Sequence, residues 1–172
     1  MAKRVLVGYV TRCGSTAEVA DAIAAVLRAS DLNVDVRPAR EVRSLDGYDA
    51  VVLGAPLYFG KLLGDAPRFL ARQRSTLQAL PVAVFTLGAA SDKPEERQAA
   101  EASFDAQMAR CAWLKPASTR AFGGRWDPEL LRFPFSLLKK ALQAQPSSDA
   151  RDWAAIDAWA AGLPALLWPA AG

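Results

Sequence analysis

Small and hydroxyl-bearing residues follow the first apolar run of the chain, Val5 to Val10, and precede an Ala-rich stretch with apolar residues at helical spacing. A turn from a buried strand into a helix N-terminus presents unpaired backbone N–H groups and the positive end of the helix dipole, both of which attract anions. The pattern therefore predicts a phosphate site. Its residues are Thr11, Arg12, Cys13, Gly14, Ser15 and Thr16.

The same turn can be compared with four known motifs. Ser15 and Glu18 form the S-x-x-E pattern of a capping box, which needs no ligand. The nucleotide motifs G-x-x-x-x-G-K-[ST] and G-x-G-x-x-G do not occur here. A cysteine phosphatase loop would need an arginine six places after Cys13, where Val19 stands. Phosphate binding and simple helix capping therefore both remain open.

Two further loops follow later apolar runs and could hold a flat ring. The first contains Pro56, Leu57, Tyr58, Phe59 and Gly60. Its adjacent aromatic side chains could stack on a π-system such as an isoalloxazine ring, or could simply pack under a neighbouring loop. The second contains Thr86, Leu87, Gly88 and Ala89, small enough to leave room for a ring edge. Together, the three loops match one phosphate joined to one flat heterocycle.

The elements that must position these loops alternate along the chain. Strands are predicted at Val5–Val10, Asn33–Arg37, Asp49–Gly54, Val82–Leu87 and Ala117–Phe122. Helices are predicted after Thr16, from Asp65, from Pro94 to about Trp113, and after an N-cap at Asp149, with a surface tail from Leu163. Such alternation favours a single α/β domain over residues 1–172, with a five-stranded parallel sheet in the order 2-1-3-4-5 and helices on both faces.

Composition narrows the range of functions. The 172 residues are 52% hydrophobic and 23% charged, with a net charge of +3 and no histidine. Without histidine, hydrolytic triads and zinc sites are disfavoured, and we predict no metal site and no catalytic side chain. The basic residues are too dispersed for nucleic-acid binding. The first apolar run is too short for a signal peptide, so a cytoplasmic location is expected.

Residues 126–145 interleave apolar side chains with Arg132, Lys139 and Lys140. A basic amphipathic stretch of this kind can rest on anionic lipid at the inner membrane face, or can meet an apolar, acidic partner such as a porphyrin or quinone. An ordinary helix covering the sheet would have the same pattern. Peripheral membrane contact is therefore one of two expectations for this segment, and the oligomeric state is left open.

The motifs also carry a family resemblance. The turn T-R-C-G-S-T resembles the T-x-T-G-x-T pattern of flavodoxins, with Cys13 at the third place. More closely, three segments are similar to flavodoxin-domain proteins grouped with bacterial menaquinone-dependent protoporphyrinogen oxidase; they are Arg12–Thr16, Tyr48–Gly54 and Arg151–Ala160. The resemblance implies a flavodoxin-like fold that binds flavin mononucleotide (FMN).

In that family pattern, the turn Thr11–Thr16 would hold the FMN phosphate, and the segments Pro56–Gly60 and Thr86–Ala89 would lie on either side of the flavin ring. The resemblance implies an FMN-dependent oxidoreductase, such as one that passes electrons between a porphyrinogen and a quinone, or a related flavin reductase. An electron carrier or regulatory flavin-binding module without its own substrate is the alternative.

Overall fold

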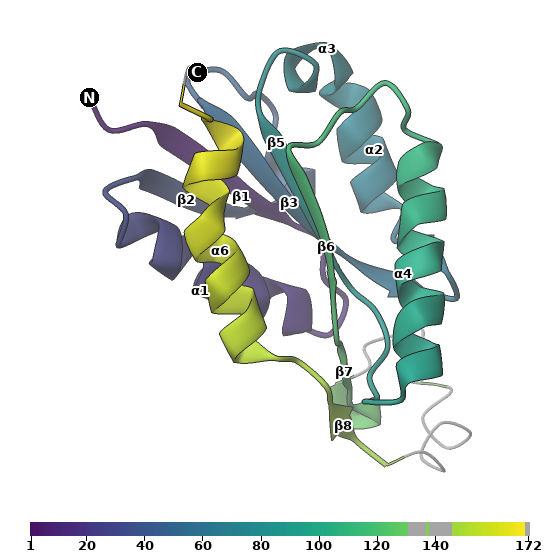
Figure 1. Ribbon diagram of the computed structural model, residues 1–172. Coiled ribbons are helices and arrows are strands. Elements are labelled where there is room, and N and C mark those ends of the chain that lie inside the picture. The colour runs from purple at the N-terminus through teal and green to yellow at the C-terminus, as the bar shows by residue number, and fades with distance from the viewer. Residues whose placement is uncertain (131–136, 138–145, 171–172) are drawn as a thin grey trace.

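A central sheet positions every loop singled out above. The computed structural model describes residues 1–130, 137 and 146–170. Five parallel strands lie in the order β2-β1-β3-β5-β6 (Figure 1), and they are β1 (Arg4–Tyr9), β2 (Asn33–Pro38), β3 (Ala50–Tyr58), β5 (Val82–Leu87) and β6 (Ser118–Phe122). The predicted order 2-1-3-4-5 is confirmed, since β5 and β6 are the fourth and fifth parallel strands. A short strand β4 (Lys61–Leu62) pairs antiparallel with β3, so the sheet is mixed rather than wholly parallel.

Helices cover both faces of this sheet. One face carries α1 (Ser15–Arg28) and α6 (Trp153–Leu167), and the other carries α2 (Asp65–Arg72), α3 (Arg74–Leu77) and α4 (Pro94–Ala109) (Figure 1). Shorter elements are the 3₁₀ turns η1 (Ala39–Glu41) and η2 (Pro128–Leu130), and the strand pair β7 (Arg125–Trp126) and β8 (Ser148–Asp149). The predicted three-layer architecture is therefore confirmed.

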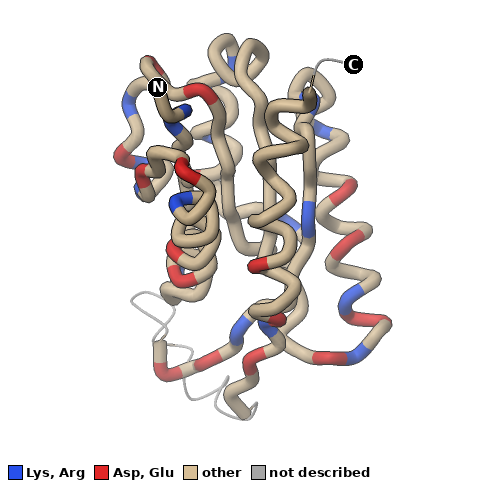
Figure 2. The backbone as a smooth tube through the Cα atoms, turned by 60° about the vertical axis from the view of Figure 1, so that its left-hand side comes forward, with Lys and Arg blue, Asp and Glu red and all other residues tan. Residues whose placement is uncertain are grey.

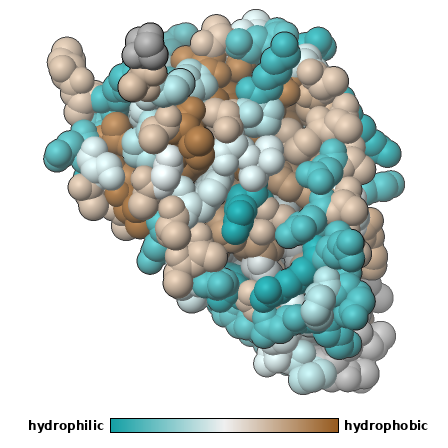
Figure 3. All heavy atoms as spheres, in the orientation of Figure 1, coloured by the Kyte–Doolittle hydropathy of each residue, from teal (hydrophilic) through white to brown (hydrophobic). Residues whose placement is uncertain are grey.

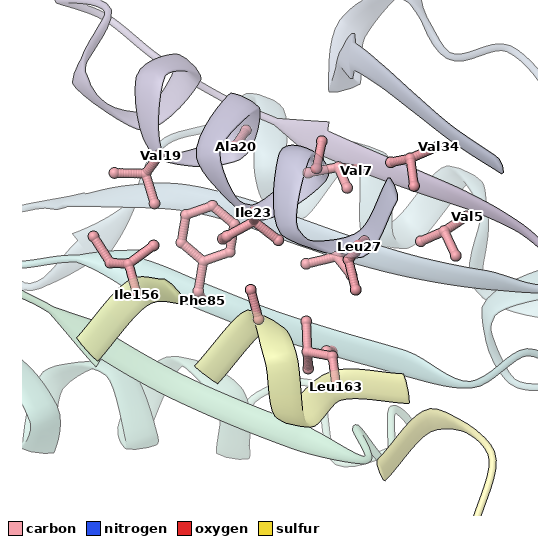
Figure 4. Close-up of a cluster of buried hydrophobic side chains, with 14 of the residues drawn as sticks. Val5, Val7, Val19, Ala20, Ile23, Leu27, Val34, Phe85, Ile156 and Leu163 are labelled. Carbon is pink, nitrogen blue, oxygen red and sulfur yellow. The ribbon is translucent and has the colours of Figure 1, made fainter. Parts of the chain in front are cut away.

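The core beneath α1 and α6 follows from the helical spacing of apolar residues. Val19, Ile23 and Leu27 lie one turn apart on the buried stripe of α1. They meet Ile156 of α6 and Phe85 of β5 (Figure 4). Because the loop Thr11–Gly14 joins β1 directly to α1, this packing fixes where that loop lies.

The helices α4 and α6 differ from the sequence predictions. Helix α4 ends at Ala109 rather than near Trp113. The cap of α6 is Asp152, which accepts a hydrogen bond from the N–H of Ala155 at 3.0 Å, whereas the predicted cap, Asp149, lies in β8. The segment from Leu163 is not a surface tail, because the helix continues to Leu167 and both leucines are buried. Burial of these side chains outweighs the cost of Pro164 inside the last turns.

Gly54 illustrates how tightly the sheet packs against α6. A Cβ atom at Gly54 of β3 would lie 2.1 Å from Cζ of Phe85, its neighbour in β5. The Phe85 ring in turn contacts the Trp159 ring edge-on, with their centroids 6.0 Å apart. The ring therefore has little room to move away from an added methyl group.

We expect Gly54→Ala to lower the free energy of unfolding by about 2 kcal/mol, the usual effect of overpacking a core. Urea denaturation measures it. Gly8→Ala in β1 is the matched control, because its nearest neighbour would be Cδ1 of Leu53 at an ordinary 3.6 Å, and it should change stability little. Equal losses in both variants would show that the Phe85 ring does not restrict position 54.

The interfacial segment predicted at 126–145 lies largely outside the described residues, which leave out 131–136 and 138–145. Its amphipathic interpretation stays a prediction. Within the described ranges, no helix is long and apolar enough to cross a bilayer. Figure 2 shows Lys and Arg interspersed with Asp and Glu along the chain rather than gathered by sign.

Candidate functional site

The turn after β1 is held by its own side chain and by glycine. Thr11 Oγ1 accepts a hydrogen bond from the N–H of Gly14 at 2.9 Å, which closes the turn. Gly14 has a φ of 89°, in the left-handed region that side chains rarely adopt, and the chain enters α1 directly after it. A Cβ built at Gly14 would meet nothing within 4 Å. The turn therefore leaves open space before the helix.

The start of α1 offers unpaired donors to that space. The N–H of Glu18 bonds to the carbonyl of Gly14 at 3.1 Å, in the i to i−4 pattern. The N–H groups of Ser15, Thr16 and Ala17 precede this bond and have no intrahelical carbonyl to reach. Three donors and the positive end of a 14-residue helix suit an anion.

The capping-box alternative does not describe this helix. Its N-cap is Gly14 and not Ser15, and no side chain caps it. Ser15 is already the first helical residue. The carboxylate of Glu18 turns away from the helix start, because it pairs with Arg125 at 3.1 Å and with Arg151 at 2.6 Å.

Thr16 supplies the observation most specific to a ligand. Its side chain is 0% exposed, and Oγ1 has no hydrogen-bond partner in the part of the chain that the structure describes. A buried hydroxyl without a partner is destabilising, so native proteins seldom retain one without a reason. A phosphate oxygen at the start of α1 would provide that partner. The residues of the turn therefore fit a phosphate group.

The second predicted loop is partly strand. Pro56, Leu57 and Tyr58 belong to β3, and Tyr58 pairs with Lys61 of β4 across a two-residue hairpin turn. That turn is Phe59–Gly60, with φ values of 50° and 72°. Positive φ at both positions is the pattern of a type I′ turn. Sequence reasoning missed the hairpin, because neither β4 nor a typical turn dipeptide stands out here.

The two predicted aromatic residues have different environments in the structure. Tyr58 packs against the first turn, with its hydroxyl 4.0 Å from Sγ of Cys13 and its ring 5.1 Å from Cζ of Arg12. Burial, followed by the neighbouring Cys13, raises the pKa of Tyr58 to about 12. Phe59, by contrast, is 103% exposed at the hairpin tip. Packing under a neighbouring loop thus describes Tyr58, while Phe59 is left available to a partner.

The third predicted segment is divided between the strand and the loop. Thr86 and Leu87 are buried in β5, and the Thr86 hydroxyl donates to the carbonyl of Ala55 at 2.7 Å. These two side chains therefore contribute to the packing and hydrogen bonding of the sheet. Gly88 and Ala89 lie in the loop, where a Cβ on Gly88 would be 2.6 Å from Cβ of Ala100 in α4. Only the backbone of Gly88 therefore fits so close to that helix.

The second and third segments meet around a shared groove. A hollow of about 260 Å³ is lined by Leu57 and Gly60 on one side and by Gly88 and Ala89 on the other. Its floor comes from α4, through Glu96, Ala99, Ala100 and Ser103. Sequence reasoning missed these helix residues, although the small side chains of Ala99, Ala100 and Ser103 could have indicated a face that leaves room. Tyr58 lies between the lining residues Leu57 and Gly60 in sequence and contacts Cys13 of the first turn.

A larger groove of about 390 Å³ runs along the outer edge of β6, between α4 and the start of α6. Of the predicted site residues, only Ala89 lines it. We place the candidate site at the three loops rather than here, because the buried unpaired hydroxyl and the helix start lie at the loops. No cluster of His, Cys, Asp and Glu suited to a metal ion occurs among the described residues.

A doubly wound sheet in the order β2-β1-β3-β5-β6, with unpaired N–H groups after its first strand and a groove at the next two strand ends, is the arrangement of the flavodoxin class. Consistently, the family model of the flavodoxin domain matches residues 6–135, which include all three loops. The chain therefore belongs to the flavodoxin domain family.

Individual relatives add detail. Protoporphyrinogen IX dehydrogenase (quinone) of Escherichia coli K12 is 27% identical over 96 residues, or 55% of this chain. The match covers 53% of that protein, so the chain spans about half the length of the curated relatives it matches.

Solved flavodoxins share the fold. A flavodoxin from the domain Archaea gives a TM-score of 0.51 at 20% identity, covering 80% of this chain and 92% of that one. Oxidised flavodoxin 1 of Bacillus cereus gives 0.51 at 20% identity, covering 84% and 100%.

Proposed function

We propose that the protein is an oxidoreductase that binds FMN at the three loops, with the phosphate at the start of α1. The observation that carries this proposal is the buried, unpartnered Thr16 hydroxyl beside the first turn of α1, within the part of the chain that the structure describes. Family membership and the shared groove at the next two strand ends support it.

The chain's own residues would bind and orient the cofactor. The N–H groups of Ser15 and Ala17 and the hydroxyl of Thr16 would donate to the phosphate oxygens, while the backbone at Gly60 and Gly88 would lie along the ring. The raised pKa of Tyr58 keeps its hydroxyl protonated at neutral pH, so it can donate a hydrogen bond but cannot act as a base. FMN, when bound, supplies the redox chemistry, which is consistent with a chain that has no histidine.

A porphyrinogen as electron donor and a quinone as acceptor form the specific part of the proposal. Its support is the activity for which the E. coli relative is named, and the matched stretch is about half of each protein. Each two-electron step would remove two hydrogen atoms from the porphyrinogen and convert the quinone to the quinol. We further propose a cytoplasmic location, with residues 126–145 as the segment that meets apolar partners.

The test is anaerobic turnover by the FMN-loaded protein. We expect porphyrin fluorescence to appear when protoporphyrinogen IX and menaquinone are both present, and to stay at the uncatalysed level when the quinone or the FMN is omitted. An FMN-loaded protein that produces no porphyrin with either menaquinone or ubiquinone would exclude this substrate assignment.

One observation favours the alternative function of a flavin-binding electron carrier. The two solved flavodoxins named above share the fold over 92% and 100% of their length. If the bound flavin is reduced by a reductase and reoxidised by a protein acceptor, without any porphyrinogen turnover, the carrier function would be the correct one.

A further inference from the structure

A buried arginine side chain ties the segment before α6 to the first turn of α1. The Arg151 side chain is 4% exposed. Its Nε and Nη2 donate to the two carboxylate oxygens of Asp149 at 2.8 and 2.6 Å, and its Nη1 donates to Glu18 at 2.6 Å. The Trp153 ring lies under the guanidinium, 4.7 Å from Cζ. A guanidinium group that is hydrogen-bonded on both sides and packed on an aromatic ring has a fixed orientation.

Glu18 is the shared partner in this network. It lies in the first turn of α1 and also accepts from Arg125 of β7 at 3.1 Å. Its two arginine partners are 107 and 133 positions away in the sequence. The network therefore ties the strand pair β7–β8 to the helix that begins at the proposed phosphate site. Figure 3 shows hydrophilic residues gathered at this lower end of the molecule.

The same strand pair is bonded to the third loop. Arg125 pairs with Asp149 across β7 and β8, and the N–H of Ala150 donates to the carbonyl of Gly124 at 2.9 Å. The N–H of Gly124 in turn donates to the carbonyl of Ala89 at 2.7 Å. A Cβ on Gly124 would lie 2.7 Å from the carbonyl oxygen of Gly88, so this approach requires glycine. A continuous set of contacts thus runs from α1 to the Gly88–Ala89 loop.

We propose that Arg151 and Glu18 are positioning residues, which hold the Gly88–Ala89 loop at a fixed distance from the start of α1. This inference rests on the proposed binding of FMN. A ligand that uses both places, phosphate at α1 and ring at the loop, gains affinity from that fixed distance, because both sites are preorganised for one molecule. A ligand that uses only the ring site gains nothing from it.

The direction in which Glu18→Gln changes FMN affinity distinguishes a positioning role of Glu18 from a purely electrostatic one. Glu18 places a negative charge one turn from the proposed phosphate. On charge alone, Glu18→Gln would strengthen FMN binding, since it removes a repulsion. If Glu18 acts by positioning, the same change weakens FMN binding because the ion pairs to Arg125 and Arg151 are lost.

The experiment compares dissociation constants for FMN and riboflavin, which lacks the phosphate. We expect Glu18→Gln to weaken FMN binding about fivefold, and Arg151→Gln about tenfold, as expected for losing charge-assisted hydrogen bonds. Riboflavin binding should be nearly unchanged in both. The double variant should lose less than the product of the two single losses, since both changes act on one network.

The matched control is Arg4→Gln, which breaks a 2.7 Å ion pair with Asp35 on β2 and should leave both affinities unchanged. A Glu18→Gln protein that binds FMN as tightly as the wild type, or more tightly, would overturn the inference, as would equal losses for FMN and riboflavin. If Arg151→Gln fails to fold, Glu18→Gln decides alone. A wild-type protein that does not bind FMN would instead refute the proposed function itself.

Discussion

Ser15→Asp is expected to abolish FMN binding while making the ligand-free protein slightly more stable. Ser15 is the first residue of α1, and a carboxylate at a helix N-terminus contributes about 0.3–1 kcal/mol through the helix dipole. The same charge would stand against the proposed phosphate. At a separation of about 4 Å the repulsion reaches several kcal/mol, so the dissociation constant should rise at least about 100-fold.

Calorimetric titration with FMN and thermal unfolding of the ligand-free protein measure the two effects of Ser15→Asp. The control is Ser15→Asn, because asparagine has the shape of aspartate without its charge. This variant should retain most of the affinity for FMN. Stability is expected to rise while FMN affinity falls. A variant that is more stable and yet fails to bind FMN cannot owe its defect to unfolding. FMN affinity unaffected by the aspartate would show that the phosphate does not lie at α1.

Thr16→Val is expected to have the second largest effect. The change keeps the shape of the side chain and removes a buried hydroxyl that has no partner in the described part of the chain. Without ligand, the variant should therefore be more stable by about 1 kcal/mol. It should bind FMN about 30- to 150-fold more weakly, since a hydrogen bond to a charged phosphate contributes about 2–3 kcal/mol.

Thr86→Val provides the contrast, because the Thr86 hydroxyl is equally buried and does have a partner, the carbonyl of Ala55 at 2.7 Å. We expect this variant to be less stable by about 1 kcal/mol and to bind FMN nearly as the wild type does. Unfolding in urea and FMN titration are measured for both variants. Loss of stability in Thr16→Val, together with unchanged FMN affinity, would show that its hydroxyl serves only the fold.

Much of this molecule was predictable from local patterns. Continuous apolar runs predicted the buried strands β3 and β5, because strands covered on both faces need no polar side. The glycine-containing turn before an amphipathic stretch predicted the start of α1 to within two residues. These features depend on neighbours in sequence, which is why a pattern can indicate them.

Other features depend on distant residues and left no such signal. Whether Ser15 and Glu18 formed a capping box could not be decided locally, because the partners of Glu18 are Arg125 and Arg151. The Arg151-Asp152-Trp153 segment was recognisable only as a motif. In the structure Arg151 binds two carboxylates, Asp152 caps α6, and the Trp153 ring packs on the guanidinium. These roles follow from the fold and not from the residue types.

The affinities of the wild-type protein for FMN and for riboflavin, measured side by side, test the phosphate site most directly. The two ligands share a ring and differ in the phosphate. A phosphate bound by the Ser15–Ala17 N–H groups and the Thr16 hydroxyl should make FMN bind at least about 100-fold more tightly. Equal affinities for the two ligands, or no binding of FMN at all, would contradict the claim that the turn after β1 is a phosphate site.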